Sequence, residues 1–213
     1  MHSSPLSPSN RLSLPFWAGL ALPLLLALSA GCTTLPPAPP SDALAQAQWE
    51  AHRDRLSRLN DWTLRGRAAY TTPTEGGSLS LFWQHQGTQT RLVLTSALGQ
   101  GGAELLIDPL GASLRDSEGR EYSAESADAL LQRLTGLPVP VSALSRWIIG
   151  LPEDDASPTR LDAQGRLRQL ESDGWLVQYR EYVEVNDHVL PRRLTVERED
   201  LQLRLVIDAW TLP

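Results

Sequence analysis

The sequence predicts an α+β domain in which a long antiparallel meander of strands is interrupted by helices gathered on one side of a curved sheet. Most of residues 62–210 alternates apolar and polar side chains with a period of two, which is typical of strands. Clusters of Gly, Pro, Asn and Asp separate these runs, as hairpins require. Apolar residues recur at helical spacing in three other stretches, residues 42–59, 126–134 and 141–149.

The first 31 residues are predicted to be a secretory signal peptide that is removed from the mature chain. Residues 20–31 read L-A-L-P-L-L-L-A-L-S-A-G, an apolar core that ends in the small residues a signal peptidase accepts. Pro15 and Pro23 interrupt the apolar run, so it is too short and too broken for a membrane-spanning helix. The only cysteine of the chain, Cys32, follows directly.

A cysteine in this position resembles the lipobox of bacterial lipoproteins, although Ser29 stands where that motif commonly has a large aliphatic residue. The resemblance implies an S-diacylglycerol and an N-acyl chain on Cys32, and no other cofactor or metal is expected. Two or more acyl chains anchor a protein firmly, since each buried CH₂ contributes about 0.8 kcal/mol. The alternative is an ordinary buried cysteine.

Residues 32–41 are predicted to be a lipid-anchored linker, and residues 42–213 the folded domain. The linker reads C-T-T-L-P-P-A-P-P-S, and its prolines favour an extended conformation that holds the domain away from the anchor. Many Gram-negative lipoproteins are retained in the inner membrane by an Asp after the lipidated cysteine. Thr33 stands there instead, so the expected address is the outer membrane.

The composition limits the partners and the chemistry of the domain. The chain carries a net charge of −6, and loss of the signal peptide removes one positive residue, Arg11. This balance disfavours nucleic acid, and on average it disfavours anionic lipid surfaces too. With a single cysteine the domain has no internal disulfide. Seven tryptophans against two phenylalanines suit a core, an apolar pocket or a membrane interface equally.

The first predicted helix covers residues 42–59, and its apolar stripe comprises Trp49, His52 or Arg53, Leu56 and Leu59. Strands are then expected at residues 62–70, 79–84, 91–95, 103–108, 112–116 and 120–122.

The second and third predicted helices end at glycines. Residues 126–134 stop at Gly136, a typical C-terminal cap, and residues 141–149 stop at Gly150. Strand patterns then resume at residues 159–162, 167–172, 175–182, 190–197 and 201–210.

Six segments of the chain form a distinctive set. They are L-N-D-W-T-L-R-G-R-A-A-Y (59–70), F-W-Q-H-Q-G (82–87), L-T-S-A-L-G (94–99), L-T-G-L-P-V-P (134–140), L-S-R-W-I-I-G-L-P (144–152) and G-W-L-V-Q-Y (174–179). Together they resemble the LolB family of outer-membrane lipoprotein receptors across nearly the whole mature chain.

The resemblance implies an incomplete antiparallel β-barrel whose helices cover a concave apolar cavity. It also implies a receptor that accepts triacylated lipoproteins from a periplasmic LolA-like carrier and inserts them into the inner leaflet of the outer membrane. Such a receptor is expected to be a lipid-anchored monomer facing the periplasm.

The resemblance also implies which residues act. The family carries an exposed apolar residue on a loop between two strands, implicated in delivery to the membrane; that position falls on Leu98, preceded here by Ala97 where Pro is frequent. Inward-facing positions are the candidates for the cavity wall, although a cavity wall and an ordinary core look identical in sequence. These candidates are Trp83, Leu92, Leu94, Leu105, Trp147, Ile148, Trp175, Val177, Leu203 and Leu205.

Two further questions stay open at this point. Arg65 and Arg67 lie on the face opposite Trp62 and Leu64, where they are either solvated or paired with a carboxylate on the helices. Other function classes are a periplasmic hydrolase and a lipid-anchored scaffold protein. A hydrolase lacks sequence support, because the histidines have no HExxH spacing and no G-x-S-x-G motif occurs. The expectation is therefore a protein without catalytic residues.

Overall fold

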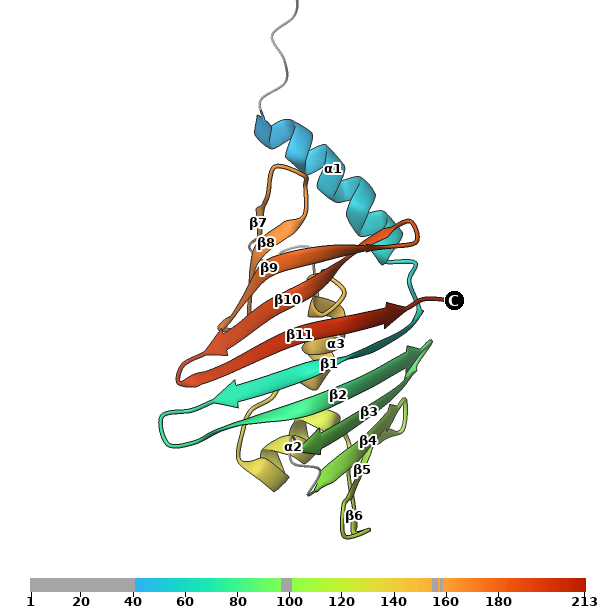
Figure 1. Ribbon diagram of the computed structural model, residues 1–213, viewed down its shortest axis with the longest axis vertical. Helices are drawn as coiled ribbons and strands as arrows, with labels where there is room; N and C mark the ends of the chain where they lie inside the picture. The colour runs from blue at the N-terminus through green and yellow to red at the C-terminus, as the bar shows by residue number, and fades with distance from the viewer. Residues whose placement is uncertain (1–40, 97–100, 155–156, 158) are drawn as a thin grey trace, which may run out of the picture. The chain divides into compact units, whose positions relative to one another are not determined.

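An antiparallel sheet of eleven strands forms the body of the described structure (Figure 1). The computed structural model describes residues 41–96, 101–154, 157 and 159–213. The predicted signal peptide, Cys32, almost all of the linker and Leu98 lie outside these residues. The strands are β1 (Asp61–Thr71), β2 (Gly76–Gln86), β3 (Gln89–Ser96), β4 (Gly102–Asp108), β5 (Gly111–Asp116), β6 (Glu121–Ala124), β7 (Thr159–Leu161), β8 (Leu167–Ser172), β9 (Trp175–Val185), β10 (His188–Arg198) and β11 (Leu201–Thr211).

The strand order is β6-β5-β4-β3-β2-β1-β11-β10-β9-β8-β7, so two meanders are joined where β1 pairs with β11. The outer strands β6 and β7 are only four and three residues long and do not pair with each other. The sheet is therefore curved but unclosed, as the predicted incomplete barrel requires. Short edge strands also offer little unpaired backbone to other chains.

Three helices complete the described part of the chain: α1 (Ser41–Leu56), α2 (Ala127–Thr135) and α3 (Val141–Trp147). Figure 1 shows α2 and α3 against one face of the sheet, while α1 lies beside the β7–β8 hairpin. No described helix combines the length and the apolarity that crossing a bilayer requires.

Local signals in the sequence explain where α2 begins and ends. The Ser126 side chain accepts a hydrogen bond from the Ala129 N–H at 3.2 Å, which satisfies a free donor of the first turn. Gly136 ends the helix with φ 74°, a left-handed conformation that glycine adopts without steric cost.

Two predicted helix ends are wrong by a few residues. The first helix was expected through residue 59 but ends at Leu56, and Leu59 lies in a tighter turn whose N–H bonds to the Leu56 carbonyl. The third ends at Trp147 rather than 149, because Ile149 and Gly150 bond back over three residues. In both places apolar spacing continues into a turn that no longer has α-helical hydrogen bonds.

The core lies between the sheet and the helices and follows the predicted alternation. Along β1, Trp62 and Leu64 are buried while Arg65 and Arg67 are exposed on the other face. From the helices, Leu130 and Trp147 are fully buried in the same core. We call the space between the sheet and α2–α3 the half-barrel interior.

Candidate functional site

All ten predicted wall residues face the half-barrel interior, whose side chains are packed together as one core. Leu94 and Leu203 are half-buried against this core. The other eight are buried within it, and these are Trp83, Leu92, Leu105, Trp147, Ile148, Trp175, Val177 and Leu205. The predicted facing of these positions is therefore correct, while their role in holding a ligand stays a prediction. In this conformation α2 and α3 fill the concave side of the sheet.

One depression leads from the surface to this interior. It measures about 380 Å³, within the range of small-ligand pockets, and lies between the α2–α3 connection and the β8–β9 turn. Trp147 and Trp175, two predicted wall residues, form part of its lining. The remaining lining residues are Asp128, Ala129, Gln132, Pro138, Val139, Pro140, Ala143, Glu153, Asp173 and Arg198. We call this depression the mouth.

The mouth includes functional candidates that the reading of the sequence missed. Pro138, Val139 and Pro140 belong to the L-P-V-P part of a segment that resembles the LolB family, yet they lie in a connection with no strand or helix period. The composition of this segment was the available signal, because Pro138 and Pro140, on either side of Val139, hold the connection in an extended shape.

Two buried indole groups in the interior lack a hydrogen-bond acceptor. The Nε1 atoms of Trp83 and Trp147 are inaccessible to solvent, and neither has a partner among the described residues. A buried donor without a partner costs about 1–3 kcal/mol. The packed interior therefore holds two donors that an oxygen-bearing ligand would satisfy.

Few polar contacts fasten the helices over the interior. The Tyr179 hydroxyl on β9 donates to the Trp147 carbonyl at the end of α3, at 2.9 Å. Arg133 on α2 donates to the Ser123 carbonyl on β6 at 2.7 Å. Burial raises the pKa of Tyr179, so its phenol stays a protonated donor. The rest of the described helix–sheet interface is dominated by apolar contacts.

A sequence model of the family described as outer membrane lipoprotein LolB matches residues 60–210. The chain belongs to the LolB family. It is 39% identical to outer-membrane lipoprotein LolB of Ectopseudomonas mendocina over 188 residues, covering 87% of this chain and 92% of that protein. It is 36% identical to the LolB of Vibrio vulnificus over 205 residues, covering 92% and 96% of the two chains.

Solved structures support the same fold. A LolA superfamily protein from Nitrosomonas europaea superimposes with a TM-score of 0.52 at 11% identity, covering 79% of this chain and 93% of that one. A putative outer membrane lipoprotein-sorting protein domain from Vibrio parahaemolyticus gives 0.51 at 8% identity, covering 81% and 93%. These similarities show that the chain shares its fold with these two proteins.

The two arginines left open by the sequence lie on the face of the sheet opposite the helices. Arg67 pairs with Asp208 of β11 through two hydrogen bonds of 2.9 and 3.2 Å, and the bond with Asp208 raises the pKa of Arg67. Arg65 lies 5.8 Å from the centre of the Phe82 ring. The partner of Arg67 is therefore on the sheet and not on the helices. The pairing of β1 with β11 brings Asp208 beside Arg67, although the two residues are 141 positions apart in the sequence.

Among the described residues, no group of three or more His, Cys, Asp or Glu side chains is placed to hold a metal ion. His85 on β2 bonds through Nδ1 to the Thr90 hydroxyl at 2.8 Å, and burial lowers its pKa. His188 lies close enough to His52 on α1 for its charge to help lower the pKa of His52, after burial and the charges of Arg55 and Arg166. Burial, reinforced by nearby Arg55, lowers the pKa of His52 to about 4, so this side chain is neutral at pH 7.

Leu98, the predicted membrane-active residue, lies outside the described residues, in the segment between the end of β3 and the start of β4. The Ser96 N–H at the end of β3 donates to the Gly101 carbonyl just before β4, at 3.0 Å. The role of Leu98 stays a prediction.

Proposed function

We propose that this chain is an outer-membrane-anchored receptor that takes triacylated lipoproteins from a LolA-like periplasmic carrier. It inserts them into the inner leaflet of the outer membrane. One observation carries the proposal: a member of the LolB family has an unclosed sheet whose apolar interior is covered by helices held with few polar bonds. The anchor is the acylated Cys32, and the domain faces the periplasm.

Transfer of a lipoprotein requires an apolar cavity that shields its acyl chains, and it requires no catalytic group. An acyl chain exposed to water costs about 0.8 kcal/mol for each CH₂, so a triacylated protein must be shielded during its passage. Transfer of the cargo is thermodynamically favourable if the apolar cavity of the receptor binds the acyl chains more tightly than that of the carrier. No nucleophile, metal or nucleotide enters this scheme.

Acceptance of acyl chains requires α2 and α3 to move away from the sheet, because they fill the interior in this conformation. The free energy of this exchange is nearly balanced, because the acyl chains replace the apolar side chains of α2 and α3 against the same sheet. Its main cost is the breaking of polar bonds such as that between Tyr179 and Trp147. In return, ester and amide carbonyls at the heads of the acyl chains supply acceptors for the indoles of Trp83 and Trp147.

A photo-crosslinking amino acid at Leu94 tests this placement. Leu94 is half-buried on the interior side of β3, and its neighbour Val93 is half-buried on the opposite side, which makes Val93 a matched control. Each variant is mixed with carrier loaded with a radiolabelled lipoprotein and then irradiated. We expect crosslinks to the acyl-bearing part of the cargo from Leu94 and none from Val93.

Other outcomes separate the competing functions. Equal crosslinking from both positions, or none from Leu94 while cargo still binds, would contradict an acyl site in the interior. A scaffold protein would bind no acylated cargo, and a hydrolase would release free fatty acid from it, which thin-layer chromatography of the same samples detects.

A further inference from the structure

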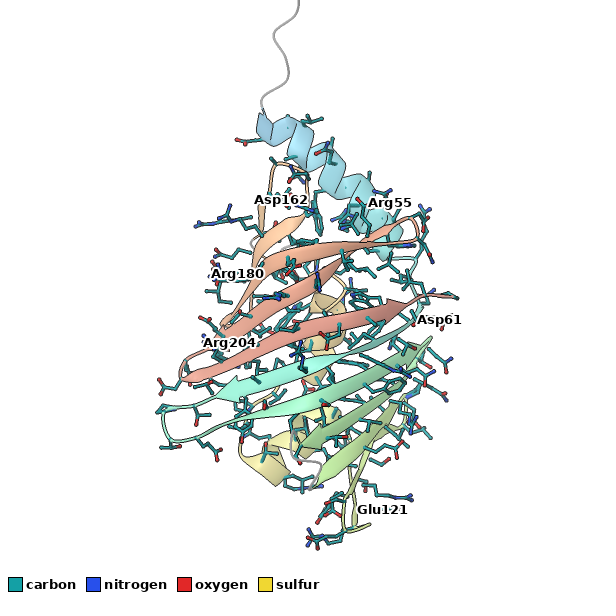
Figure 2. The ribbon with its side chains drawn as sticks, viewed as in Figure 1. Arg55, Asp61, Glu121, Asp162, Arg180 and Arg204 are labelled. Carbon is teal, nitrogen blue, oxygen red and sulfur yellow. The ribbon has the colours of Figure 1, made fainter. Side chains whose placement is uncertain are left out.

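Three arginines share one depression on the face of the sheet that carries no helix. Arg160 on β7, Arg168 on β8 and Arg180 on β9 line a depression of about 440 Å³. All three side chains are exposed, and Figure 2 labels Arg180 on this part of the sheet. None of the described residues that line the depression carries a carboxylate; the others are Leu161, Gln169, Gln178 and Tyr179. We call this depression the arginine site.

No arginine of the arginine site forms an ion pair with a described residue. Arg180 bonds to the Gln178 side-chain oxygen at 2.6 Å. Three acids in or beside these strands have other partners.

Glu181 on β9 is held by Arg192 and Arg193, each at 2.9 Å, and Asp162 is held by Arg166 at 2.7 Å. Glu171 accepts a hydrogen bond from Gln169 at 2.9 Å. The neutral Gln169 amide does not cancel the charge of Glu171, but no described carboxylate forms an ion pair with the three arginines, which leaves their guanidinium groups available to an outside anion.

We propose that the arginine site binds the phosphate of an anionic phospholipid on the surface of the membrane to which the chain is anchored. Guanidinium groups suit phosphate, because their planar donors bond two phosphate oxygens at once. The amides of Gln169 and Gln178 at the same depression add neutral donors. The proposal rests on the membrane anchoring in the proposed function, but not on acceptance of cargo.

The position of α1 favours a membrane over a soluble anion. Helix α1 begins nine residues after Cys32, a length of chain that reaches about 30 Å at most. The same helix is packed closely on the turn between β7 and β8: a Cβ on Gly165 would lie 2.6 Å from the Ala45 carbonyl oxygen. Two of the three arginines are carried by those two strands. Anchoring at Cys32 therefore keeps the arginine site at a high effective concentration near lipid headgroups.

The net charge of the chain does not indicate this site. A net charge of −6 argues against binding to anionic lipid, although a local cluster of positive charge can still bind it. The arginines elsewhere on the sheet are largely paired, as in Arg67–Asp208 and Arg115–Glu121. Arg65, Arg198 and Arg204 on other strands also lack an ion pair with a described residue, but Arg160, Arg168 and Arg180 share one depression on β7, β8 and β9. A contact with the membrane at this place would fix which side of the domain faces the bilayer while cargo is delivered.

Vesicle binding tests the proposal on the mature chain with Cys32→Ala, which removes the anchor. The vesicles are pure phosphatidylcholine, or phosphatidylcholine with one-third phosphatidylglycerol, at low and high salt. The test variant is Arg160→Gln/Arg168→Gln/Arg180→Gln. The matched control is Arg67→Gln/Arg91→Gln/Arg115→Gln, which removes the same charge from arginines that already have carboxylate partners.

We expect salt-sensitive binding to the phosphatidylglycerol vesicles and weaker binding to pure phosphatidylcholine. The test variant should lose roughly 100-fold in affinity, because each basic residue near an anionic surface contributes a factor of about five. The control should lose about threefold or less.

Three results would overturn the proposal. The first is equal loss in both variants, which would mean that only net charge matters. The second is equal binding to the two kinds of vesicle. The third is saturation by millimolar inorganic phosphate without vesicle binding, which would mean a site for a free anion. Lipoprotein transfer by the anchored chain is measured separately, so failure here leaves the receptor function standing.

Discussion

Replacing Tyr179 with phenylalanine is expected to make the half-barrel interior open more readily. The change removes one hydroxyl, the donor at 2.9 Å to the Trp147 carbonyl at the end of α3, and keeps the buried ring. The carbonyl retains the Gly150 N–H at 2.9 Å, so no buried acceptor is orphaned. The loss is therefore that of one neutral hydrogen bond, about 1 kcal/mol.

Two measurements follow from that magnitude. The midpoint of thermal unfolding should fall by about 2–4 °C, the shift expected for 1 kcal/mol in a domain of this size. If opening breaks the same bond, the open population should rise about fivefold, and the uptake of a fluorescent long-chain acyl probe should accelerate by up to that factor. Stopped-flow mixing measures the uptake rate.

Tyr182→Phe is the matched control. Its hydroxyl donates to the Leu167 carbonyl on β8, within the sheet rather than to α2 or α3. This variant should lose similar stability without faster uptake. Equal uptake rates in the two variants would refute the reasoning that the Tyr179 bond holds the helices closed.

Three further predictions follow from burial and charge. Leu130→Ala on α2 should lower the free energy of unfolding in urea by about 2–5 kcal/mol, because Leu130 is fully buried. The more exposed Leu134→Ala on the same helix should cost about 0.5 kcal/mol; similar losses would contradict the described packing. His52 has a lowered pKa when folded, so the unfolded chain takes up its proton first. As the pH falls from about 6.5 to 4 the protein should lose up to about 3 kcal/mol, and His52→Gln should flatten this dependence; parallel curves would refute it. Leu98→Glu should leave cargo acceptance intact but block insertion into liposomes, and normal insertion by this variant would exclude the role assigned to Leu98.

The period-two pattern was sufficient to predict the sheet. Each of the eleven described strands overlaps an expected one, because one face of an antiparallel sheet is buried and the alternation records it. Trp62 and Leu64 therefore point to the core and Arg65 away from it. Helix caps such as Ser126 and Gly136 are local signals, so the ends of α2 could be predicted from the sequence as well.

Contacts between side chains on strands that are far apart in the sequence could not be predicted. Asp208 meets Arg67 only because β1 and β11, near the two ends of the domain in the sequence, are neighbours in the sheet. Sequence spacing does not carry that information.

The packed state of the interior could not be predicted either. An inward Leu or Trp has the same pattern whether a helix or a ligand covers it. The roles of Cys32 and Leu98 rest on the motif and family resemblance and await experiment.

The most direct test of the receptor function is transfer of cargo between proteins. The mature domain, from Thr33 onward, is mixed with a LolA-like carrier loaded with a triacylated lipoprotein, and a tag on each protein reports by pull-down where the lipoprotein resides. We predict one-way movement of the lipoprotein from the carrier to this chain. A folded domain that leaves the lipoprotein on an active carrier would contradict the receptor function and favour a lipid-anchored scaffold.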